Sequence, residues 1–439
     1  MMLDASSAAK TEVVRMAGGL RDASLDEFTS ASLLSFSKAK DPRRVGVLTR
    51  IPPKALITIA DFSTILASSD RGLRDQLFAD LRRVYDGELN RDLGNMERGL
   101  AWSGRVTMLA ASTPAIDEFS SHSDKLGPRW LYHRGVPSTT TARRAGAGKR
   151  ISERQLEANR ATARQLFTEM VTHGQAAYLA ARLPDEAEAE LGDIAVAGTI
   201  CRSPVPRESY GRREIIGLPV TEEPYRLGYQ LKSLARGAMA IGYSTAGAVA
   251  LARRCAMDTV PPVRVRVLRV LQGDGTALPA AAIGRLAQTD RKVALRALGD
   301  LRALQITACP VEDESDADDT SGPYSAGPKL WMLSQSQDED VAEKVGLVRD
   351  VVRKLSTRAD SVPNSGDKPS NPQVQENAED SGDRPSGPVP SVSPHVWEHP
   401  RGVLAPGIVP GPAPMNGHAH YDFEHLWRMA DHSAEAGAY

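Results

Sequence analysis

The chain has 439 residues, which is enough for about two or three domains. Its 54 Lys and Arg residues nearly balance its 55 Asp and Glu residues, so the overall charge speaks neither for nor against nucleic acid, and any basic surface has to be local. Three distant cysteines, Cys201, Cys255 and Cys309, lack zinc-site or disulfide-framework spacing. Because there is neither a long apolar run nor a signal pattern, we expect a cytoplasmic protein with no membrane contact.

The N-terminal third predicts an α/β fold class. Residues 24–131 alternate short β-rich runs with helical patterns, which is typical of a largely parallel sheet. The clearest strands are ALITIAD, residues 55–61, and GRVTMLAAST, residues 104–113. Between them the apolar residues of a crossover helix recur at helical spacing: Leu73, Leu77, Leu81 and Val84.

The middle of the chain reads as helical. A pattern over residues 151–182 begins with a Ser-x-x-Gln capping box, and a further helix is expected over residues 224–241. We therefore expect an α/β domain over residues 1–135 and a helical lid or connector over residues 136–257.

Residues 258–336 have the pattern of a winged helix-turn-helix. Three short helices are followed by two β-like runs, in this order: 261–272, 278–288, 289–304, 305–309 and 328–334. The polar insert between the two runs, residues 310–327, would be the wing, and it is unusually acidic.

A last helix is expected over residues 337–358, and the remainder, residues 359–439, has the Pro-, Ser- and Gly-rich composition of a disordered tail. Near its end, YDFEHLWRMAD reads as a short helix that docks on a protein partner, with Phe423, Leu426 and Trp427 as anchors.

Two separated segments suggest a nucleotide site. DASSAAKTEVV, residues 4–14, places Lys-Thr after small residues, as in the phosphate loop G-x-x-x-x-G-K-[ST], and Asp61 ends a strand. In such sites the Lys bridges the terminal phosphates, the hydroxyl binds magnesium and the carboxylate positions that magnesium. Lys10, Thr11 and Asp61 would thus bind ATP and Mg²⁺, with Thr11 and Asp61 on the metal.

The loop departs from this motif in two ways. Asp4 and Ala9 stand where glycines belong, and the Asp4 carboxylate would repel phosphate. The sequence also indicates no strand ahead of the loop, so either an upstream part is absent or the site is degenerate. A carboxylate after a strand is also a common turn or helix-cap residue, which is the structural alternative for Asp61.

The ordered part of the chain resembles a family of bacterial phage- and plasmid-borne P-loop ATPase-like proteins with a C-terminal winged helix. The resemblance covers about residues 5–334 and depends on the order of these segments: KTEVV, LITIADFSTIL, LRRVYDGELNRDLG, WSGRVTMLAASTPAID, LGPRWLYHR, EEPYRLGYQLKSLARGAMAIG and the helix-turn-helix. It implies a P-loop NTPase-like domain in which Asp61 is the Walker B carboxylate. Phe62 stands where a water-activating acid usually follows, which puts fast hydrolysis in doubt.

The resemblance also implies further site residues. Ser112 or Thr113 would sense the γ-phosphate, although a Ser-Thr-Pro turn is the structural alternative. Arg129 and Arg134 would reach a neighbouring subunit's nucleotide in a homo-oligomer, and Arg226 would be a lid arginine. The alternatives are a salt-bridged Arg134, and an ion pair of Arg226 with a neighbouring glutamate.

A local basic face is predicted on the third helix of the helix-turn-helix. Arg291, Lys292 and Arg296 are expected to face DNA there, and Val293, Leu298 and Leu301 to face the core. On the first helix, Arg264, Arg266 and Arg269 could contact phosphates. The acidic wing and the frequent use of winged helices in protein interaction are the counterarguments.

Three functions remain open from the sequence. The first is a mobile-element protein that couples its nucleotide state, with or without ATP hydrolysis, to DNA binding. The second is a DNA-binding transcriptional regulator or accessory protein with a degenerate, non-hydrolysing nucleotide site. The third is a protein-interaction adaptor.

Overall fold

The structure is a computed structural model. It describes residues 1–4, 10–26, 28–37, 43–66, 70–92, 99–119, 129–135, 152–208, 214–273, 276–309 and 330–356. The predicted wing, the tail with its docking segment and Ala9 lie outside these residues.

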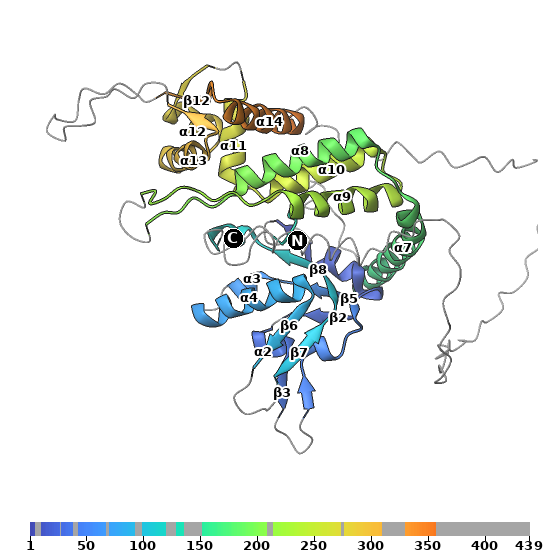
Figure 1. The fold of residues 1–439 in the computed structure, drawn as a ribbon. Helices are drawn as coiled ribbons and strands as arrows, with labels where there is room; N and C mark the ends of the chain where they lie inside the picture. The colour runs from blue at the N-terminus through green and yellow to red at the C-terminus, as the bar shows by residue number, and fades with distance from the viewer. Residues whose placement is uncertain are drawn as a thin grey trace, which may run out of the picture. The chain divides into compact units, whose positions relative to one another are not determined.

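A sheet of five parallel strands forms the centre of the α/β part, so the predicted α/β class and parallel sheet are confirmed (Figure 1). The strand order is β2-β5-β8-β1-β9. The strands are β1 (Met2–Leu3), β2 (Ala23–Leu25), β5 (Lys54–Ile59), β8 (Arg105–Ser112) and β9 (His133–Arg134). The two predicted strands are thus present as β5 and β8, each slightly shorter than expected.

Burial on both faces explains the composition of β5. Ile57 and Ile59 are fully buried and Thr58 is 1% exposed, as expected for a strand covered by helices on both sides. The register pairs Ile59 with Ala110 of β8 and, on the next strand, Leu3 of β1 with Ser112. Since all pairings are parallel, the strands end at one common edge, which we call the carboxyl edge.

The crossover helix α4 (Arg71–Asp86) begins and ends at residues suited to those positions. The Asp70 side chain accepts a hydrogen bond of 2.9 Å from the Leu73 N–H, and Gly87 follows the helix with a φ of 102°. Of the predicted core positions, Leu77, Leu81 and Val84 are buried, but Leu73, in the first turn of the helix, is 56% exposed.

Helix α1 (Lys10–Met16) lies on the other face of the sheet. The chain crosses from β1 toward β2 in one direction and from β5 toward β8 in the opposite one, and right-handed crossovers then place α1 and α4 on opposite faces. A strand does precede α1, because Met2–Leu3 form β1 between β8 and β9. The prediction that no strand anchors the loop is therefore wrong: two residues suffice as a strand when both neighbours supply hydrogen bonds.

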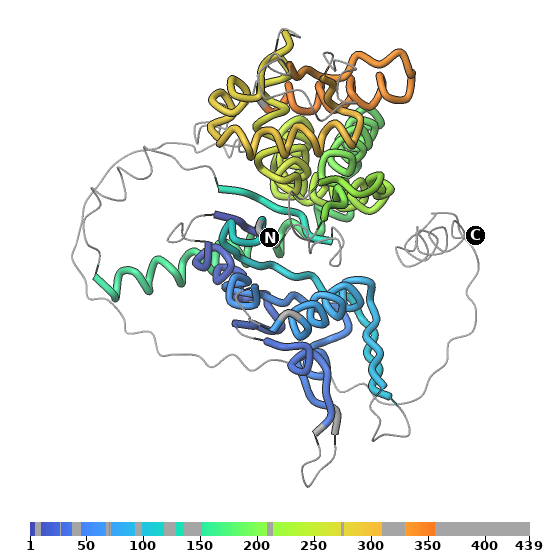
Figure 2. Tube along the Cα trace, turned by 90° about the vertical axis from the view of Figure 1, so that its left-hand side faces the viewer, coloured from blue at the N-terminus to red at the C-terminus, as the bar shows by residue number. Residues whose placement is uncertain are grey.

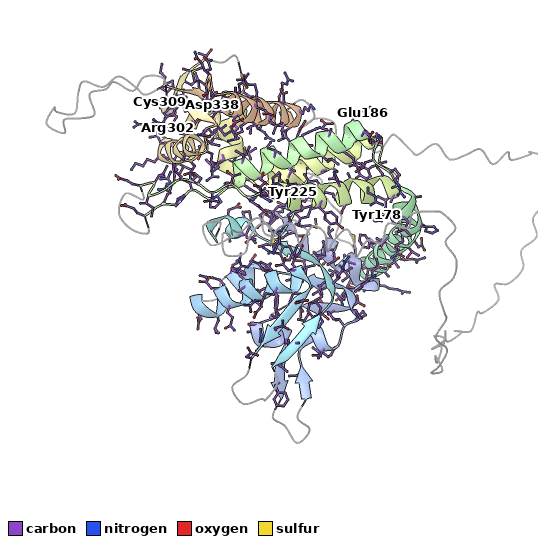
Figure 3. The ribbon with its side chains drawn as sticks, in the orientation of Figure 1. Tyr178, Glu186, Tyr225, Arg302, Cys309 and Asp338 are labelled. Carbon is purple, nitrogen blue, oxygen red and sulfur yellow. The ribbon has the colours of Figure 1, made fainter. Side chains whose placement is uncertain are left out.

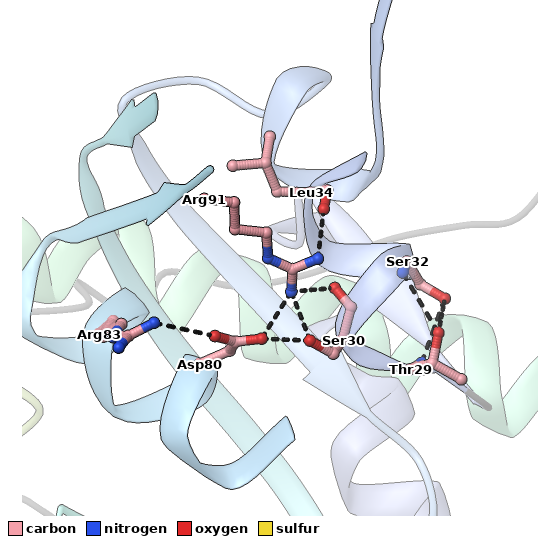
Figure 4. A network of polar contacts seen from close by, with 7 residues as sticks. All are labelled: Thr29, Ser30, Ser32, Leu34, Asp80, Arg83 and Arg91. Atoms are coloured by element: carbon pink, nitrogen blue, oxygen red, sulfur yellow. Dashed lines mark hydrogen bonds and ion pairs between the residues drawn. The ribbon is translucent and has the colours of Figure 1, made fainter. Parts of the chain in front are cut away.

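Two hairpins that the sequence analysis did not predict project from the α/β part (Figure 2). They are β3–β4 (Ser35–Ser37 and Arg43–Val45) and β6–β7 (Glu88–Arg91 and Leu100–Ser103). Arg91 fixes the second hairpin to helix α2 (Ser30–Leu33), donating to the Leu34 carbonyl at 2.6 Å and pairing with the buried carboxylate of Asp80 (Figure 4). Short 3-10 and helical turns complete this part: η1 (Ala17–Gly19), η2 (Val47–Thr49), α3 (Ser63–Leu66) and η3 (Pro114–Phe119).

A second hydrophobic core is formed by helices. They are α8 (Asp185–Arg202), α9 (Tyr225–Ala240), α10 (Thr245–Asp258), α11 (Pro262–Leu271), α12 (Ala280–Leu286), α13 (Arg291–Ala303) and α14 (Glu339–Ser356). Helix α7 (Glu153–Ala180) lies outside this core and contacts α9. The predicted cap of α7 is present, because Ser152 accepts from the Gln155 N–H at 3.2 Å. Arg236 of α9 holds the far end of α7: it donates to the Tyr178 carbonyl at 3.0 Å and lies over the Tyr178 ring, which Figure 3 labels.

Residues 262–333 contain the three expected helices α11, α12 and α13. They also contain three short antiparallel strands, β10 (Leu278–Pro279), β11 (Thr307–Ala308) and β12 (Leu330–Leu333), in the order β10-β12-β11. No helix within the described ranges, the 28-residue α7 included, is long and apolar enough to cross a membrane.

Candidate functional site

The carboxyl edge of the sheet contains the position where a ligand is most expected. The connection that leaves β1 and the one that leaves its neighbour β8 run in opposite directions along the sheet. In open parallel sheets, ligands bind in the crevice at such a reversal, beyond the strand ends. Asp4, which follows β1, donates its N–H to the Ser112 carbonyl at 3.3 Å, so the two strand ends are in direct contact here.

Lys10 and Thr11 open α1 at this edge. Lys10 is buried, with 9% of its surface exposed. The Thr11 hydroxyl donates to the carbonyl of Ala60, the residue before Asp61, at 3.4 Å. The start of α1 and the end of β5 are therefore adjacent, as the expectation for Lys10, Thr11 and Asp61 requires.

Asp61 is exposed and anchors a turn. Its Oδ1 accepts from the Ser63 N–H at 2.9 Å, which is the hydrogen bond of an Asx turn. Ser63 in turn contacts the end of β8: its hydroxyl lies 3.0 Å from Thr113 Oγ1 and 3.3 Å from Ser112 Oγ, and it accepts from the Thr113 N–H at 2.9 Å. The hydroxyls of Ser63, Ser112 and Thr113 thus form one cluster, which is linked to Asp61 through the Ser63 backbone, and the Ser112 side chain is fully buried.

Asp4 adds a second carboxylate near this edge, next to Gly135. The Gly135 N–H donates to the Leu3 carbonyl at 2.8 Å. A Cβ added at Gly135 would stand 1.7 Å from Asp4 Oδ2, so a larger residue there would require the Asp4 side chain to move. The negative charge predicted to disfavour phosphate is therefore held between the ends of β1 and β9.

Phe62, which follows Asp61, belongs to the hydrophobic core. Its side chain is fully buried and stacks on Phe78, with ring centroids 6.2 Å apart. Trp130 also packs against Phe62, with ring centroids 5.7 Å apart. An aromatic core residue at this position leaves the candidate site without a carboxylate base next to Asp61.

Arg129 lies away from the carboxyl edge. It precedes β9 and forms a two-pronged ion pair with Asp86, at the end of α4, with distances of 3.1 and 2.7 Å. Both positions are at the opposite edge of the sheet, where the strands begin. Within this chain, Arg129 is therefore not brought together with Asp61 and Thr113.

The other two arginines are held in ion pairs. Arg134 binds both oxygens of Asp117 at 2.8 and 2.7 Å, and Arg226 pairs with Glu222 at 3.3 Å. These geometries agree with the structural alternatives. Arg134 nevertheless lies near the candidate site, because its partner Asp117 is in η3, which begins directly after Thr113.

A basic surface is present on α13. Arg291, Lys292 and Arg296 are exposed near the start of the helix, and the Asp290 side chain caps it by accepting from the Lys292 N–H at 2.7 Å. Val293 is 40% exposed on the same surface, so its expected place in the core is wrong. Leu298 and Leu301 are fully buried, as predicted.

Arg264 is buried and does not fit the expected phosphate contact. It is 6% exposed, and its guanidinium donates to the carbonyls of Cys201 and Ser203 at 2.9 and 2.8 Å and pairs with Asp300 at 3.1 Å. Those partners engage both of its terminal nitrogens in structural contacts. Arg266 and Arg269 on the same helix are exposed.

Sequence analysis missed Ser63, which connects the ends of β5 and β8. The signal that could have found it is Asp-x-Ser after a buried strand, the pattern of an Asx turn.

Among the described side chains, no group of three or more His, Cys, Asp or Glu is arranged to hold a metal ion. That finding does not bear on a Thr11–Asp61 pair, because protein-bound Mg²⁺ needs one or two carboxylates plus waters and substrate phosphates. No protein-family model and no curated protein matches this chain.

Proposed function

We propose that this protein binds ATP with Mg²⁺ at the carboxyl edge of the α/β sheet and couples the bound nucleotide to DNA binding through residues 258–336, folded as a winged helix. The resemblance to phage- and plasmid-borne ATPase-like proteins suggests a role on a mobile element. The proposal makes Lys10 the phosphate contact, Thr11 and Asp61 the metal contacts, and Ser112 or Thr113 the sensor.

The observation that carries the proposal is the hydrogen bond between Thr11 and the Ala60 carbonyl. It brings the N-terminus of a helix, the positive end of the helix dipole, next to a strand-end carboxylate. A helix N-terminus favours the binding of phosphate, and a strand-end carboxylate favours the binding of Mg²⁺. Their meeting at the reversal of strand order is what a strand–loop–helix nucleotide site requires.

We expect the protein to bind ATP and to hydrolyse it only slowly. Water attack on a γ-phosphate needs a group that orients or activates the water. Phe62 is buried where an acid would serve, and the Asp61 Oδ1 already accepts from the Ser63 N–H. A long-lived bound state would suit a switch better than a motor.

The order of elements supports a winged helix. Three helices with a three-stranded antiparallel sheet follow one another as helix, strand, helix, helix, strand and strand. The exposed cations Arg291, Lys292 and Arg296 lie at the start of the third helix, where a recognition helix contacts the major groove.

Binding of a fluorescent ATP analogue to the full chain tests the nucleotide half. We expect saturable, Mg²⁺-dependent binding that Lys10→Met weakens at least about tenfold, the loss of one charge-assisted contact. Lys54→Met is the matched control, because Lys54 is exposed at the opposite end of β5. Absence of binding by the wild type, or equal binding by Lys10→Met, would reject the proposal.

Titration with duplex DNA tests the other half. The pair Arg291→Ala with Lys292→Ala should weaken binding and reduce its salt dependence, because phosphate contacts release counterions. A charge-matched control removes Arg349 and Arg353, which are exposed on α14. Equal losses in both double variants would show that net charge, not the α13 surface, governs the affinity.

A DNA-binding regulator with a degenerate nucleotide site is the second candidate. Asp4, fixed between two strand ends, and the buried Phe62 favour it. This candidate predicts DNA binding that is sensitive to the α13 substitutions, with no saturable ATP binding.

A further inference from the structure

A cavity of about 250 Å³ lies near the edge where the strands begin, away from the candidate nucleotide site. It is bounded by α4, the first half of β8, the segment before β9, and α9. Apolar side chains make up most of its lining, among them Val106, Met108 and Trp130. Small-molecule sites have this character: an apolar lining with a few convergent polar groups.

The first polar feature is an excess of positive charge. Arg82 and Arg129 both line the cavity, and the carboxylate of Asp86 is already bound by Arg129 through two hydrogen bonds. Burial and the neighbouring Arg129 guanidinium lower the pKa of Arg82, and the attraction of Asp86 offsets part of that shift. Among the residues that the structure describes, Arg82 makes no hydrogen bond and no ion pair. A half-buried guanidinium in this position favours an anion.

The second polar feature is an acceptor with no donor. Gln230 Nε2 donates to the Tyr85 hydroxyl and to the Arg129 carbonyl, both at 2.9 Å. Because a carbonyl can only accept, the nitrogen of the amide must face it, and this fixes which side-chain atom is the oxygen. That oxygen, Gln230 Oε1, is buried without a partner among the described residues. Buried acceptors are nearly always satisfied, so a ligand with a donor is expected.

We propose that this cavity binds a small aromatic carboxylate whose ring carries a hydroxyl or amino group. Its carboxylate pairs with Arg82, its ring packs against Trp130 and Met108, and its hydroxyl or amino group donates to Gln230 Oε1. The volume limits the ligand to about one ring, because pockets for drug-sized molecules start at roughly 300 Å³. A carboxylate is preferred as the anion because guanidinium binds it through two parallel hydrogen bonds.

This site is independent of the proposed nucleotide function. The part of its lining that comes from β8 is the first half of that strand, whereas Ser112 ends the strand and Thr113 follows it. The two sites can therefore be tested separately on the same preparation.

The test uses three single-ring compounds and the full chain, with ligand-observed NMR titration as the measurement. We expect saturable binding of 4-hydroxyphenylacetate, weaker binding of phenylacetate, which lacks the hydroxyl, and no binding of tyramine, which carries a cation instead. Arg82→Gln should weaken 4-hydroxyphenylacetate at least about tenfold, as expected for one charge-assisted contact.

Arg83→Gln is the matched control. Arg83 is the next residue on α4, its side chain is 60% exposed, and it pairs with Asp80 instead. Its removal should leave the affinity unchanged, and both variants should keep the wild-type melting profile. Any of four results would overturn the proposal: no compound saturates, tyramine binds as well as 4-hydroxyphenylacetate, phenylacetate binds equally, or Arg82→Gln binds like the wild type.

Discussion

The carboxylate of Asp258, the last residue of α10, accepts a hydrogen bond of 2.7 Å from the backbone N–H of Arg134, in β9. Arg134 returns a bond through its Nε to the Asp258 carbonyl at 2.8 Å, and Arg254 donates to the Arg134 carbonyl at 2.6 Å. The side chain of Arg134 also binds Asp117, directly after the candidate sensor residues. One arginine thus joins the carboxyl edge of the sheet to the helix that precedes α11.

Replacing Arg134 by Ala should lower the free energy of unfolding by about 2–4 kcal/mol, because it removes a partly buried ion pair and its hydrogen bonds. Arg134→Lys should fall between, since it keeps the charge without the two-pronged geometry. Urea denaturation measures the effect, with the exposed Arg154→Ala as control. A change below about 0.5 kcal/mol for Arg134→Ala would show that the junction does not stabilise the fold.

Substitution of Arg264 and of Arg269, both on α11, should change the stability of the protein by very different amounts. Arg264→Ala leaves two carbonyls and Asp300 with fewer donors in a buried place and should cost about 3–5 kcal/mol of stability. Arg269→Ala, on the exposed surface, should stay within about 0.5 kcal/mol. Guanidinium denaturation of the two variants measures their free energies of unfolding. Equal values would contradict the buried position of Arg264.

The Arg91–Asp80 pair lends itself to a double-mutant cycle. Asp80 is 2% exposed, so Arg91→Ala leaves a buried carboxylate short of donors and should cost about 3–5 kcal/mol. Removing both partners with Asp80→Ala should cost less than the sum of the single changes, because no buried charge is then left unpaired. Additive losses in thermal unfolding would indicate that the two side chains act separately.

His133 should make the fold less stable below neutral pH. Burial, followed by the nearby Arg254, lowers the pKa of His133 below its usual 6.5. As the pH falls through 6.5, the unfolded chain takes up a proton that the folded chain does not, so stability is lost in that window. Melting temperatures at pH 7.5 and 5.5 measure the effect. His133→Gln should reduce the difference between the two, whereas an identical difference would exclude His133 as its source.

Strong local patterns predicted the elements that carry them. The apolar, β-branched run of β5 and the helical period of α4 are each visible within a short window, and both elements are present. Helices α8 and α10 were missed because they are rich in Ala and Gly and buried on several sides, so no apolar stripe marks one face. With only two residues, β1 is too short to show any period.

The candidate site was predictable only in part, for a related reason. Strand-end residues such as Asp61 and Thr113 are predictable once their strands are recognised. Burial of a charge is not, because it depends on partners from distant segments: Arg264 is bound by two carbonyls at the end of α8 and by Asp300 of α13. The same holds for Arg129, whose partner Asp86 belongs to another element.

The position of β1 inside the sheet has a consequence for how the protein folds. Leu3 pairs with Ser112 on one side and with Arg134 on the other, so β1, the first of these five strands along the chain, can pair only after β8 and β9 have been made. Contacts between such distant parts of a chain slow folding, because the entropy cost of closing the loop arises before the favourable contacts form. On the ribosome, β2, β5 and α4 can therefore assemble first, and β1 enters the sheet only after β8 and β9 have emerged.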